Sequence, residues 1–221
     1  MDTATWTGSV GVVRDGAVLA AAHWRTDHSH VGELPAHVER VLREGGIGWD
    51  DLDGLAVSIG PGSFTGLRIA VAFAKGLAFA DGLQLAAVST LEALAAVAEA
   101  PGGGRVCAAI DARKQEVYAA LFRVDAGGAL RRESPDAGWK PAALAAALDP
   151  ETTVIGDAPD VYPEAFAHVR VLPFTTHHPR GEVVARLGAA RLAAGNAVEL
   201  AALEPAYVRA PDATLPANPL R

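Results

Sequence analysis

A strand-to-helix turn stands near the middle of the first half of the chain, with the sequence Ser58-Ile59-Gly60-Pro61-Gly62-Ser63-Phe64-Thr65-Gly66-Leu67-Arg68. The apolar run before it, 55–59, is typical of a buried strand. The residues after it, 63–80, are predicted to form a long helix with Ser63 as its N-cap. Glycine gives the turn the backbone freedom it needs. The turn therefore predicts a strand–helix unit of an α/β fold.

The same order of elements occurs twice along the chain. The first half is predicted to hold a hairpin followed by alternating helices and strands, at 9–14, 17–24, 32–44, 55–59, 63–80, 83–88 and 90–100. The second half repeats this order, with strands first, at 105–111, 116–123, 129–133, 141–148, 153–155, 159–167, 169–172 and 181–194. The sequence therefore predicts a duplicated α/β fold of two lobes around a cleft, each a mixed sheet flanked by helices. We place the lobes at 1–101 and 102–210 and a proline-rich tail at 211–221.

The first strand of the second half has no counterpart in the first half. The second half opens with a strand, 105–110, that leads into Asp111, whereas the first half opens directly at Asp2-Thr3-Ala4. If the halves are equivalent, a strand of about six residues is absent before Asp2. That strand would be central to the first sheet. Either the true start of the protein lies upstream of Met1, which is the alternative we favour, or the lobe forms without this strand.

Composition excludes several classes of protein. The chain has 221 residues, half of them apolar, which is enough for a full-sized core. A net charge of −7 argues against a chain that binds nucleic acid alone. The single cysteine, Cys107, rules out an internal disulfide and a CxxC zinc site. With neither a signal peptide nor an apolar stretch long enough to span a bilayer, the sequence predicts a cytoplasmic protein without a membrane segment.

The glycine-rich turn has two interpretations. It can present backbone N–H groups to an anion, because it leads from a strand into a helix. However, it matches neither the dinucleotide motif GxGxxG nor the P-loop motif, since Thr65 stands at the third glycine position and no Gly-Lys-Ser/Thr follows. The alternative is a purely structural turn, and spacing alone favours that alternative.

The helix after the turn has little polar surface. Gly66, Ala70, Ala74 and Ala78 recur at every fourth residue, and apolar side chains cover most of the remaining circumference. A helix outside an α/β sheet needs only one apolar stripe. We therefore predict that the helix contacts a partner, or else lies buried under the second lobe. The predicted contact residues are Gly60, Pro61, Gly62, Ser63, Phe64, Thr65, Gly66, Arg68, Ala70, Phe73 and Ala74. We expect Ala70→Arg or Ala74→Arg to abolish association and leave the lobe folded.

Acids and hydroxyls mark the place where each half opens. Asp2, Thr3, Thr5 and Asp111 could face one another and hold a nucleotide with Mg²⁺, although the residues alone favour a plain turn. The adjacent His177 and His178 are not expected to bind a metal. No Ser/His/Asp set and no metal-ligand spacing can be assembled, so the residues alone predict no catalytic centre and no metal site.

Several segments in combination resemble the TsaB (YeaZ) family of subunits that take part in tRNA threonylcarbamoyladenosine biosynthesis. They cover nearly the whole chain and fall in order, at Asp2–Thr5, Gly60–Ile69, Val88–Leu91, Ala109–Arg113 with Glu116–Tyr118, and Leu203–Arg209. The resemblance implies an actin-like (ASKHA) fold and a contact of the first lobe with a second copy or with the catalytic paralogue TsaD. It also implies recruitment of the ATPase TsaE and a role in modifying adenosine 37 of tRNAs that read ANN codons.

The resemblance further implies that the chain is not catalytic by itself. At the positions of the two metal-binding histidines of TsaD, this chain has Thr90 and Leu94, which cannot replace imidazoles. Contact with tRNA is expected only through the complex. The family pattern is weakened at Gly156-Asp157-Ala158, which leaves few glycines for a purine pocket. The alternatives are an actin-like kinase or ATPase that holds Mg-ATP or Mg-ADP between the lobes, and a metal-dependent, glycoprotease-like peptidase.

Overall fold

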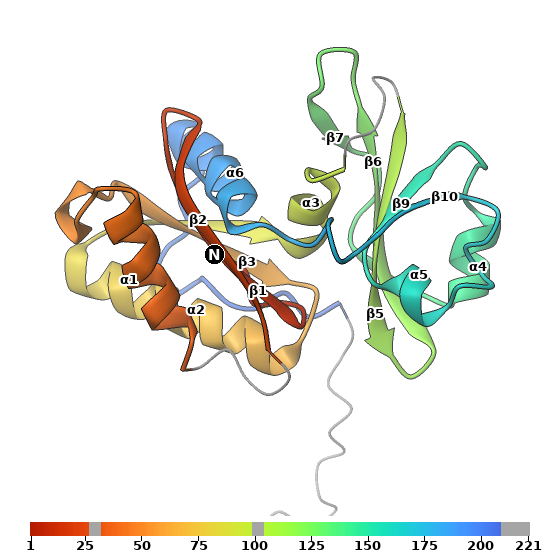
Figure 1. Cartoon of the computed structure of the whole chain (residues 1–221), viewed down its shortest axis with the longest axis horizontal. Coiled ribbons are helices and arrows are strands. Elements are labelled where there is room, and N and C mark those ends of the chain that lie inside the picture. The colour runs from red at the N-terminus through yellow and green to blue at the C-terminus, as the bar shows by residue number, and fades with distance from the viewer. Residues whose placement is uncertain (27–31, 99–103, 209–221) are drawn as a thin grey trace, which may run out of the picture.

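The computed structural model describes residues 1–26, 32–98 and 104–208. The elements of the first half are β1 (Thr7–Arg14), β2 (Ala17–Arg25), α1 (Leu34–Glu44), the short 3₁₀ helix η1 (Trp49–Asp51), β3 (Gly54–Gly60), α2 (Phe64–Asp81), β4 (Gln84–Ser89) and α3 (Thr90–Ala95). Those of the second half are β5 (Arg105–Arg113), β6 (Glu116–Val124), β7 (Leu130–Arg132), β8 (Ala137–Trp139), α4 (Pro141–Ala146), β9 (Thr153–Ile155), α5 (Ala158–Val161), β10 (Arg170–Leu172) and α6 (Gly181–Ala193). Figure 1 shows them as two lobes side by side. The two-lobed prediction is confirmed.

The second lobe is built on one continuous sheet. Its strand order is β10-β9-β5-β6-β7, and β8 also pairs with β6. The central strand β5 is antiparallel to β6 on one side and parallel to β9 on the other. The hairpin pairs and the parallel β9 and β10 make this the mixed sheet that the sequence predicts. The β8 strand is an addition that the sequence analysis did not predict.

The first lobe has the same plan with its centre missing. The antiparallel pair β1–β2 and the parallel pair β3–β4 are separate two-stranded sheets. Among the described residues, only Met1 and Asp2 lie between them: Asp2 exchanges two backbone hydrogen bonds with Ser9 of β1, of 2.8 and 2.9 Å. On the other side, the amine of Met1 donates to the Ala56 carbonyl of β3 at 2.8 Å. The absent central strand is thus confirmed, and these two residues occupy the end of its place.

The last helix of each half packs across the lobe boundary. Leu91 and Leu94 of α3 are fully buried in a core cluster with strands β5 and β6. In return, α6 packs on the first lobe, where the chain at Gly188 lies so close to Ala56 that a β-carbon would not fit. The predicted boundary at residue 101 follows the chain order, but residues 181–193 belong by packing to the first lobe.

Some predicted helices are shorter than expected. The helix predicted at 159–167 is confined to α5, because Pro163 cannot continue it. By contrast, α2 runs over the predicted length: the Ser63 side chain accepts a hydrogen bond from the Gly66 amide, and Gly82 ends the helix in the left-handed conformation. No helix in the described part of the chain is long and apolar enough to cross a membrane. The tail 211–221 lies outside the described residues.

Candidate partner surface and interlobe site

The turn after β3 meets the C-terminal segment of the described chain. The Ala206 amide donates to the Ile59 carbonyl at 2.7 Å. The ammonium group of Lys75, on α2, donates to the Leu203 carbonyl at 3.1 Å, and the Leu203 side chain is 1% exposed in the core of the first lobe. The turn after β3 and the segment 203–207, which lie far apart in the sequence, therefore form one structural unit along α2.

Three side chains make a small cluster on the surface of this unit. The Arg68 guanidinium lies 3.8 Å from the centre of the Phe64 ring and donates to the Tyr207 hydroxyl at 3.1 Å. The rings of Phe64 and Tyr207 are 5.5 Å apart. Phe64 is still 51% exposed and Tyr207 47%. A cation stacked on an aromatic ring beside a second ring is the kind of preorganised feature that protein interfaces use.

An apolar groove continues from this cluster along α1 and α2. It has a volume of about 530 Å³ and is lined by Leu34, Pro35, Phe64, Thr65, Arg68, Ile69, Ala72 and Phe73. At the far end of α2, Phe79 is 80% exposed. Figure 1 places α1 and α2 on the side of the first lobe opposite α6, where the second lobe does not cover them. The burial of α2 under the second lobe, considered as an alternative from the sequence, is therefore wrong.

The eleven predicted contact residues divide into two sets. Those that are exposed or partly exposed are Gly62, Ser63, Phe64, Thr65, Arg68 and Phe73. Those that are buried inside the lobe are Gly60, Pro61, Gly66, Ala70 and Ala74. A β-carbon on Gly66 would meet the Thr3 carbonyl, and Ala70 and Ala74 have no exposed surface. The prediction that the small-residue ridge contacts a partner is wrong: the ridge lets α2 approach its own sheet closely.

The exposed set was incomplete when read from the sequence. Leu34 and Pro35 belong to α1, and only the tertiary packing brings them beside α2. Ala72 is exposed on α2 but lies outside the four-residue repeat on which the sequence prediction rests. Tyr207 belongs to the segment Leu203–Arg209 of the family resemblance, but no sequence signal joins it to Arg68.

The first-lobe residues predicted to bind a nucleotide are buried and form hydrogen bonds within the fold. Asp2 and Thr3 have no exposed surface and Thr5 is 8% exposed. The Asp2 carboxylate accepts from the Ala4 amide at 3.0 Å, the Thr3 hydroxyl donates to the Gly66 carbonyl at 2.7 Å, and the Thr5 hydroxyl donates to the Thr7 carbonyl at 3.2 Å. These groups fix the N-terminal turn against α2, which leaves them poorly suited to hold phosphates or Mg²⁺.

Asp111 belongs to a separate network in the second lobe. Its amide donates to the Asp157 carboxylate at 2.8 Å, and its own carboxylate accepts from the Tyr162 hydroxyl at 3.1 Å and lies 3.3 Å from the Arg113 guanidinium. Burial raises the pKa of Asp157 to about 6, and the nearby Asp111 charge acts in the same direction. The structure therefore does not join Asp111 with the three first-lobe residues in one set of ligands.

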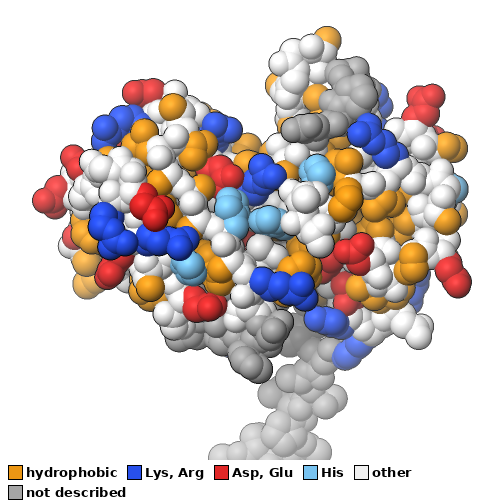
Figure 2. Space-filling model, viewed as in Figure 1, with side chains coloured by type: hydrophobic (Ala, Val, Ile, Leu, Met, Phe, Trp, Pro, Cys, Tyr) orange, Lys and Arg blue, Asp and Glu red, His pale blue; other side chains and the backbone are white. Residues whose placement is uncertain are grey.

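Histidines from both halves meet where the lobes join. His178 lies 3.2 Å from His23 between ring nitrogens, and His23 lies 3.4 Å from the Glu182 carboxylate. Figure 2 shows histidine side chains gathered at this junction. Burial lowers the pKa of His178, with the neighbouring His23 adding to the effect. Across the described ranges, no group of three His, Cys, Asp or Glu side chains is arranged to hold a metal ion.

The remaining sequence candidates lie in the core. Thr90 and Leu94 have no exposed surface, and Leu94 packs among the apolar residues beneath β5. Cys107 is fully buried, and burial raises the pKa of its thiol to about 12. A thiol with such a pKa stays protonated at neutral pH, as expected for an unreactive core residue.

Comparisons with known proteins agree with this architecture. Residues 25–159 match the family model described as TsaD, tRNA N6-adenosine threonylcarbamoyltransferase. A crystal structure from Pseudomonas aeruginosa, described as similar to the peptidase YeaZ, superimposes with a TM-score of 0.83 at 31% identity and covers 94% of this chain and 97% of that one. The chain belongs to the TsaB/YeaZ family, within the wider family that the TsaD model describes. Its fold is the actin-like fold of that family.

Two relatives bear the name tRNA threonylcarbamoyladenosine biosynthesis protein TsaB. The protein from Escherichia coli is 40% identical over 143 residues, which are 64% of this chain and 61% of that protein. The protein from Bacillus subtilis is 35% identical over 138 residues, 62% of this chain and 58% of that protein. The matched part of the chain thus spans about three fifths of the length of each relative.

Proposed function

We propose that this protein is a non-catalytic subunit of the machinery that forms N6-threonylcarbamoyladenosine at position 37 of tRNAs reading ANN codons. Its role would be to bind a TsaD catalytic subunit through the first lobe. The observation that carries this proposal is the exposed apolar face of α1 and α2 in a member of the TsaB/YeaZ family. An apolar groove between two surface helices is the kind of feature into which a partner helix packs.

The groove has the chemistry of a helix-binding surface. Its walls are aliphatic and aromatic, and Arg68 is the charged side chain in its lining. The Arg68 guanidinium is already held over Phe64 and bonded to Tyr207, so little side-chain entropy is lost when a partner binds. An amphipathic helix of TsaD laid along α1 and α2 would bury this face. Binding of that kind would favour the active arrangement of the catalytic subunit.

Other roles follow from the same surface. When the chain is alone, a second copy would cover the groove and give a homodimer. In the complex, the pair with TsaD would recruit the ATPase TsaE, and tRNA would bind mainly to those partners because this chain carries a net charge of −7. We assign no cofactor to the isolated chain, since Asp2, Thr3 and Thr5 are engaged within the fold. All these steps belong to the cytoplasm, where tRNA is modified.

The proposal is tested by light-scattering chromatography of this chain with TsaD from the same organism. We expect a co-eluting complex with one copy of each protein as its unit. Ala72→Arg places a charged side chain in the groove at an exposed position of α2 and should weaken binding about 100-fold. The matched control is Ala143→Arg, on an exposed position of α4 in the second lobe, which should leave binding unchanged.

Two results would contradict the proposal. Separate elution of the two unmodified proteins would exclude the TsaD contact. Turnover of ATP, or tight Mg-dependent binding of ATP, by this chain alone would favour an actin-like kinase or ATPase. Both variants are checked first by circular dichroism, so that a loss of binding is not confused with a loss of folding.

A further inference from the structure

A short connector, residues 173–180, carries the chain from the second lobe back to the first. Near its start, Phe174 is 1% exposed in the core of the second lobe, and its ring lies 5.0 Å from the ring of Trp6 in the first lobe. Near its end, the Pro179 carbonyl accepts a hydrogen bond of 2.9 Å from the Ser9 hydroxyl of β1. The connector is therefore anchored to a different lobe at each end.

The connector also contacts the first lobe through a pair of histidines. Nε2 of His178 lies 3.2 Å from Nδ1 of His23 on β2, which is a hydrogen-bonding distance, and the ring centres are 5.2 Å apart. The Glu182 carboxylate, at the start of α6, lies 3.4 Å from Nε2 of His23. This carboxylate favours a proton on Nε2, which leaves Nδ1 of His23 to accept the hydrogen bond from His178.

This contact depends on the protonation of the two rings. A hydrogen bond between imidazoles needs one nitrogen that donates and one that accepts, so at least one ring must be neutral. When both rings are charged, every ring nitrogen carries a proton, and two like charges face each other. Burial lowers the pKa of His178, and the charges of His23 and Arg180 act in the same direction, while Glu182 and the Phe174 backbone oppose them. His178 therefore stays neutral near pH 7 and takes up a proton only in mild acid.

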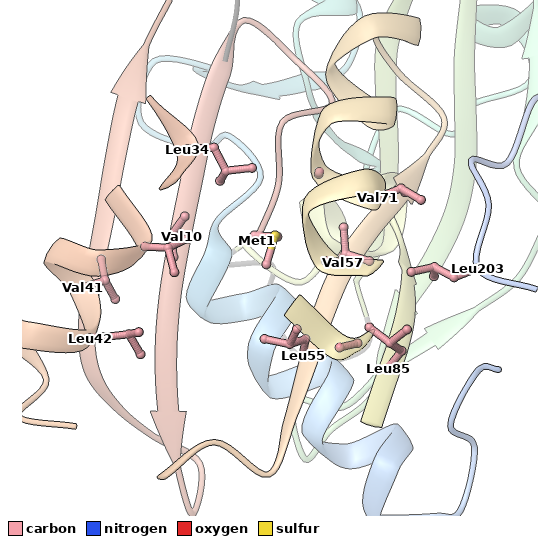
Figure 3. Packing of buried hydrophobic residues seen from close by; sticks show 14 of the residues in the cluster. Met1, Val10, Leu34, Val41, Leu42, Leu55, Val57, Val71, Leu85 and Leu203 are labelled. Atoms are coloured by element: carbon pink, nitrogen blue, oxygen red, sulfur yellow. The ribbon is translucent and has the colours of Figure 1, made fainter. Parts of the chain in front are cut away.

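Other charged groups act on the pair and on Glu182. Among the described residues, Arg180 precedes α6 and acts on both His178 and Glu182. On the side of the first lobe, the Met1 amine faces Glu182, and burial lowers the pKa of this amine to about 6. Figure 3 shows Met1 beside Val10 in the core of the first lobe. A test of the histidine pair must therefore separate its titration from that of the amine.

A second link between the lobes contains no histidine. Arg191 of α6 lies 2.6 Å from the Glu92 carboxylate of α3, and Arg132 of β7 lies 3.6 Å from the same carboxylate. The Asp136 carboxylate accepts a hydrogen bond of 2.8 Å from Ser89, at the end of β4. The histidine pair lies at the start of α6 and this ionic link near its end, so the two links are separated by most of the length of the helix. We expect the ionic link to hold in mild acid, because it contains no imidazole.

We propose that the contact between His23 and His178 fixes the angle between the two lobes in a proton-dependent way. The contact forms while at least one of the two rings is neutral, and it breaks when both are charged. Its loss frees the connector from β2 and leaves the ionic link at the other end of α6, about which the lobes can then turn. This inference does not depend on the proposed partner, because it concerns contacts within one chain.

The test measures a distance between the lobes in the full chain at two pH values. Spin labels on Glu39→Cys of α1 and Ala143→Cys of α4, both exposed positions, report one distance across the junction. The native Cys107 is fully buried, and burial raises the pKa of its thiol to about 12, so it should not react with the label. Pulsed electron paramagnetic resonance should give one narrow distribution at pH 7.5 and a shifted, broader one at pH 5.

Two neighbouring histidines provide a matched pair of variants. His178→Gln keeps a side chain that can donate to His23 but cannot take up a proton, so the distribution should stay narrow at pH 5. His177→Gln removes the adjacent histidine, whose Nδ1 lies 2.8 Å from the Thr176 hydroxyl, and should leave the pH response unchanged. The Met1 amine is common to both variants, so the difference between them isolates the histidine pair.

Two outcomes would overturn the proposal. One is the same narrow distribution at both pH values in the unmodified chain. The other is a pH response of His178→Gln equal to that of the unmodified chain. If His178→Gln does not fold, His23→Gln takes its place and should likewise remove the response.

Stability gives a second measurement. Because the pKa of His178 is lowered from 6.5, the folded state binds fewer protons than the unfolded state in mild acid. The stability that this histidine contributes is therefore complete above about pH 6.5 and is lost as pH falls below it. Urea unfolding should show that the unmodified chain and His177→Gln lose more free energy of unfolding between pH 7.5 and pH 5 than His178→Gln does. An equal loss in all three would contradict the proposal.

Discussion

The two lobes of this chain share one plan and differ at the centre of the sheet. In the second lobe, β5 is hydrogen-bonded along both edges, to β6 and to β9. In the part of the first lobe that the structure describes, only the hydrogen bonds of Met1 and Asp2 join β1 to β3. The first lobe must therefore be held together by the helices that cross its divided sheet, α1 and α2 on one face and α6 on the other. The comparison shows that helix packing can take over part of the role of a sheet.

A second difference concerns the helix that follows the first parallel strand. In the first lobe that helix is α2, with 18 residues and an exposed apolar face. In the second lobe it is α5, with four residues, which Tyr162 and Pro163 end. The lobe with the incomplete sheet is thus the one with the candidate partner surface. Substitutions on the buried side of α2 should lower the stability of the fold. Substitutions on its exposed side should weaken association with a partner.

The largest effect is expected from Ala74→Arg, on the buried side of α2. Ala74 has no exposed surface, so the guanidinium would be forced into the apolar core at a cost of at least about 4 kcal/mol in the free energy of unfolding. Ala72→Arg, two residues away on the exposed side, should cost less than about 0.5 kcal/mol. Urea unfolding followed by circular dichroism measures both. Equal stability of the two variants would mean that the first lobe does not depend on α2 packing.

A smaller effect is expected where a glycine stands at the end of a parallel strand in each lobe. Gly60 ends β3 with a φ of 122°, and Gly156 follows β9 with a φ of 127°. A β-carbon at Gly156 would overlap the Ala109 carbonyl of the fully paired β5, whereas one at Gly60 would approach the Ala206 carbonyl at 2.8 Å. We expect Gly156→Ala to cost about 3 kcal/mol and Gly60→Ala about 1 to 2 kcal/mol.

The informative result is which of the two substitutions, Gly156→Ala or Gly60→Ala, lowers the free energy of unfolding more. The strand β5 is hydrogen-bonded along both edges and cannot yield, whereas the segment at Ala206 is held against β3 by the hydrogen bond from the Ala206 amide to the Ile59 carbonyl and is not part of a sheet. Thermal unfolding of the two variants measures the difference. A larger cost at Gly60 would indicate that the C-terminal segment is held more rigidly than the sheet of the second lobe.

The duplicated fold could be predicted from the sequence because it depends on local signals. The hairpin at 9–24, the turn at Gly60 and the apolar strands are each marked by neighbouring residues, and the order of strands and helices repeats in the second half. Even the absent strand follows from comparing Asp2 with Asp111. The exchange of α3 and α6 between the lobes could not be predicted, because it depends on which sheet each helix reaches in three dimensions.

The candidate surface was predicted only in part for a related reason. The four-residue repeat of Gly66, Ala70 and Ala74 indicates that another backbone packs closely against this face of α2. The same pattern is expected whether that backbone belongs to the chain's own sheet or to a partner. The sequence does not distinguish the two. Phe64 and Arg68, two of the predicted contact residues, are exposed in the structure, while the groove they form needs Leu34 from α1, which lies thirty residues before Phe64.

The smallest expected effect is on the pH dependence of the free energy of unfolding. One group in each lobe contributes to it, and the two contributions should have opposite signs. Burial raises the pKa of Asp157, in the second lobe, to about 6, while the Asp111 and Arg113 charges act on it in opposite directions. Its ordinary pKa is 3.8, so between about pH 4 and pH 6 the folded state binds more protons than the unfolded state. Stability then falls as pH rises through this window. The Met1 amine of the first lobe, whose pKa is lowered to about 6, acts in the opposite sense between pH 6 and 8.

Asp157→Asn isolates the second-lobe contribution from that of the other titrating groups. The amide oxygen can still accept from the Asp111 amide, which bonds to the carboxylate at 2.8 Å, but it carries no charge. We expect the variant to match the unmodified chain at pH 4 and to exceed its free energy of unfolding by about 1 to 2 kcal/mol at pH 7. Urea unfolding at the two pH values measures this difference. A variant less stable than the unmodified chain at pH 7 would mean that the Asp157 charge is needed to hold Asp111 and Arg113, and that the second lobe is stabilised by this network rather than strained by it.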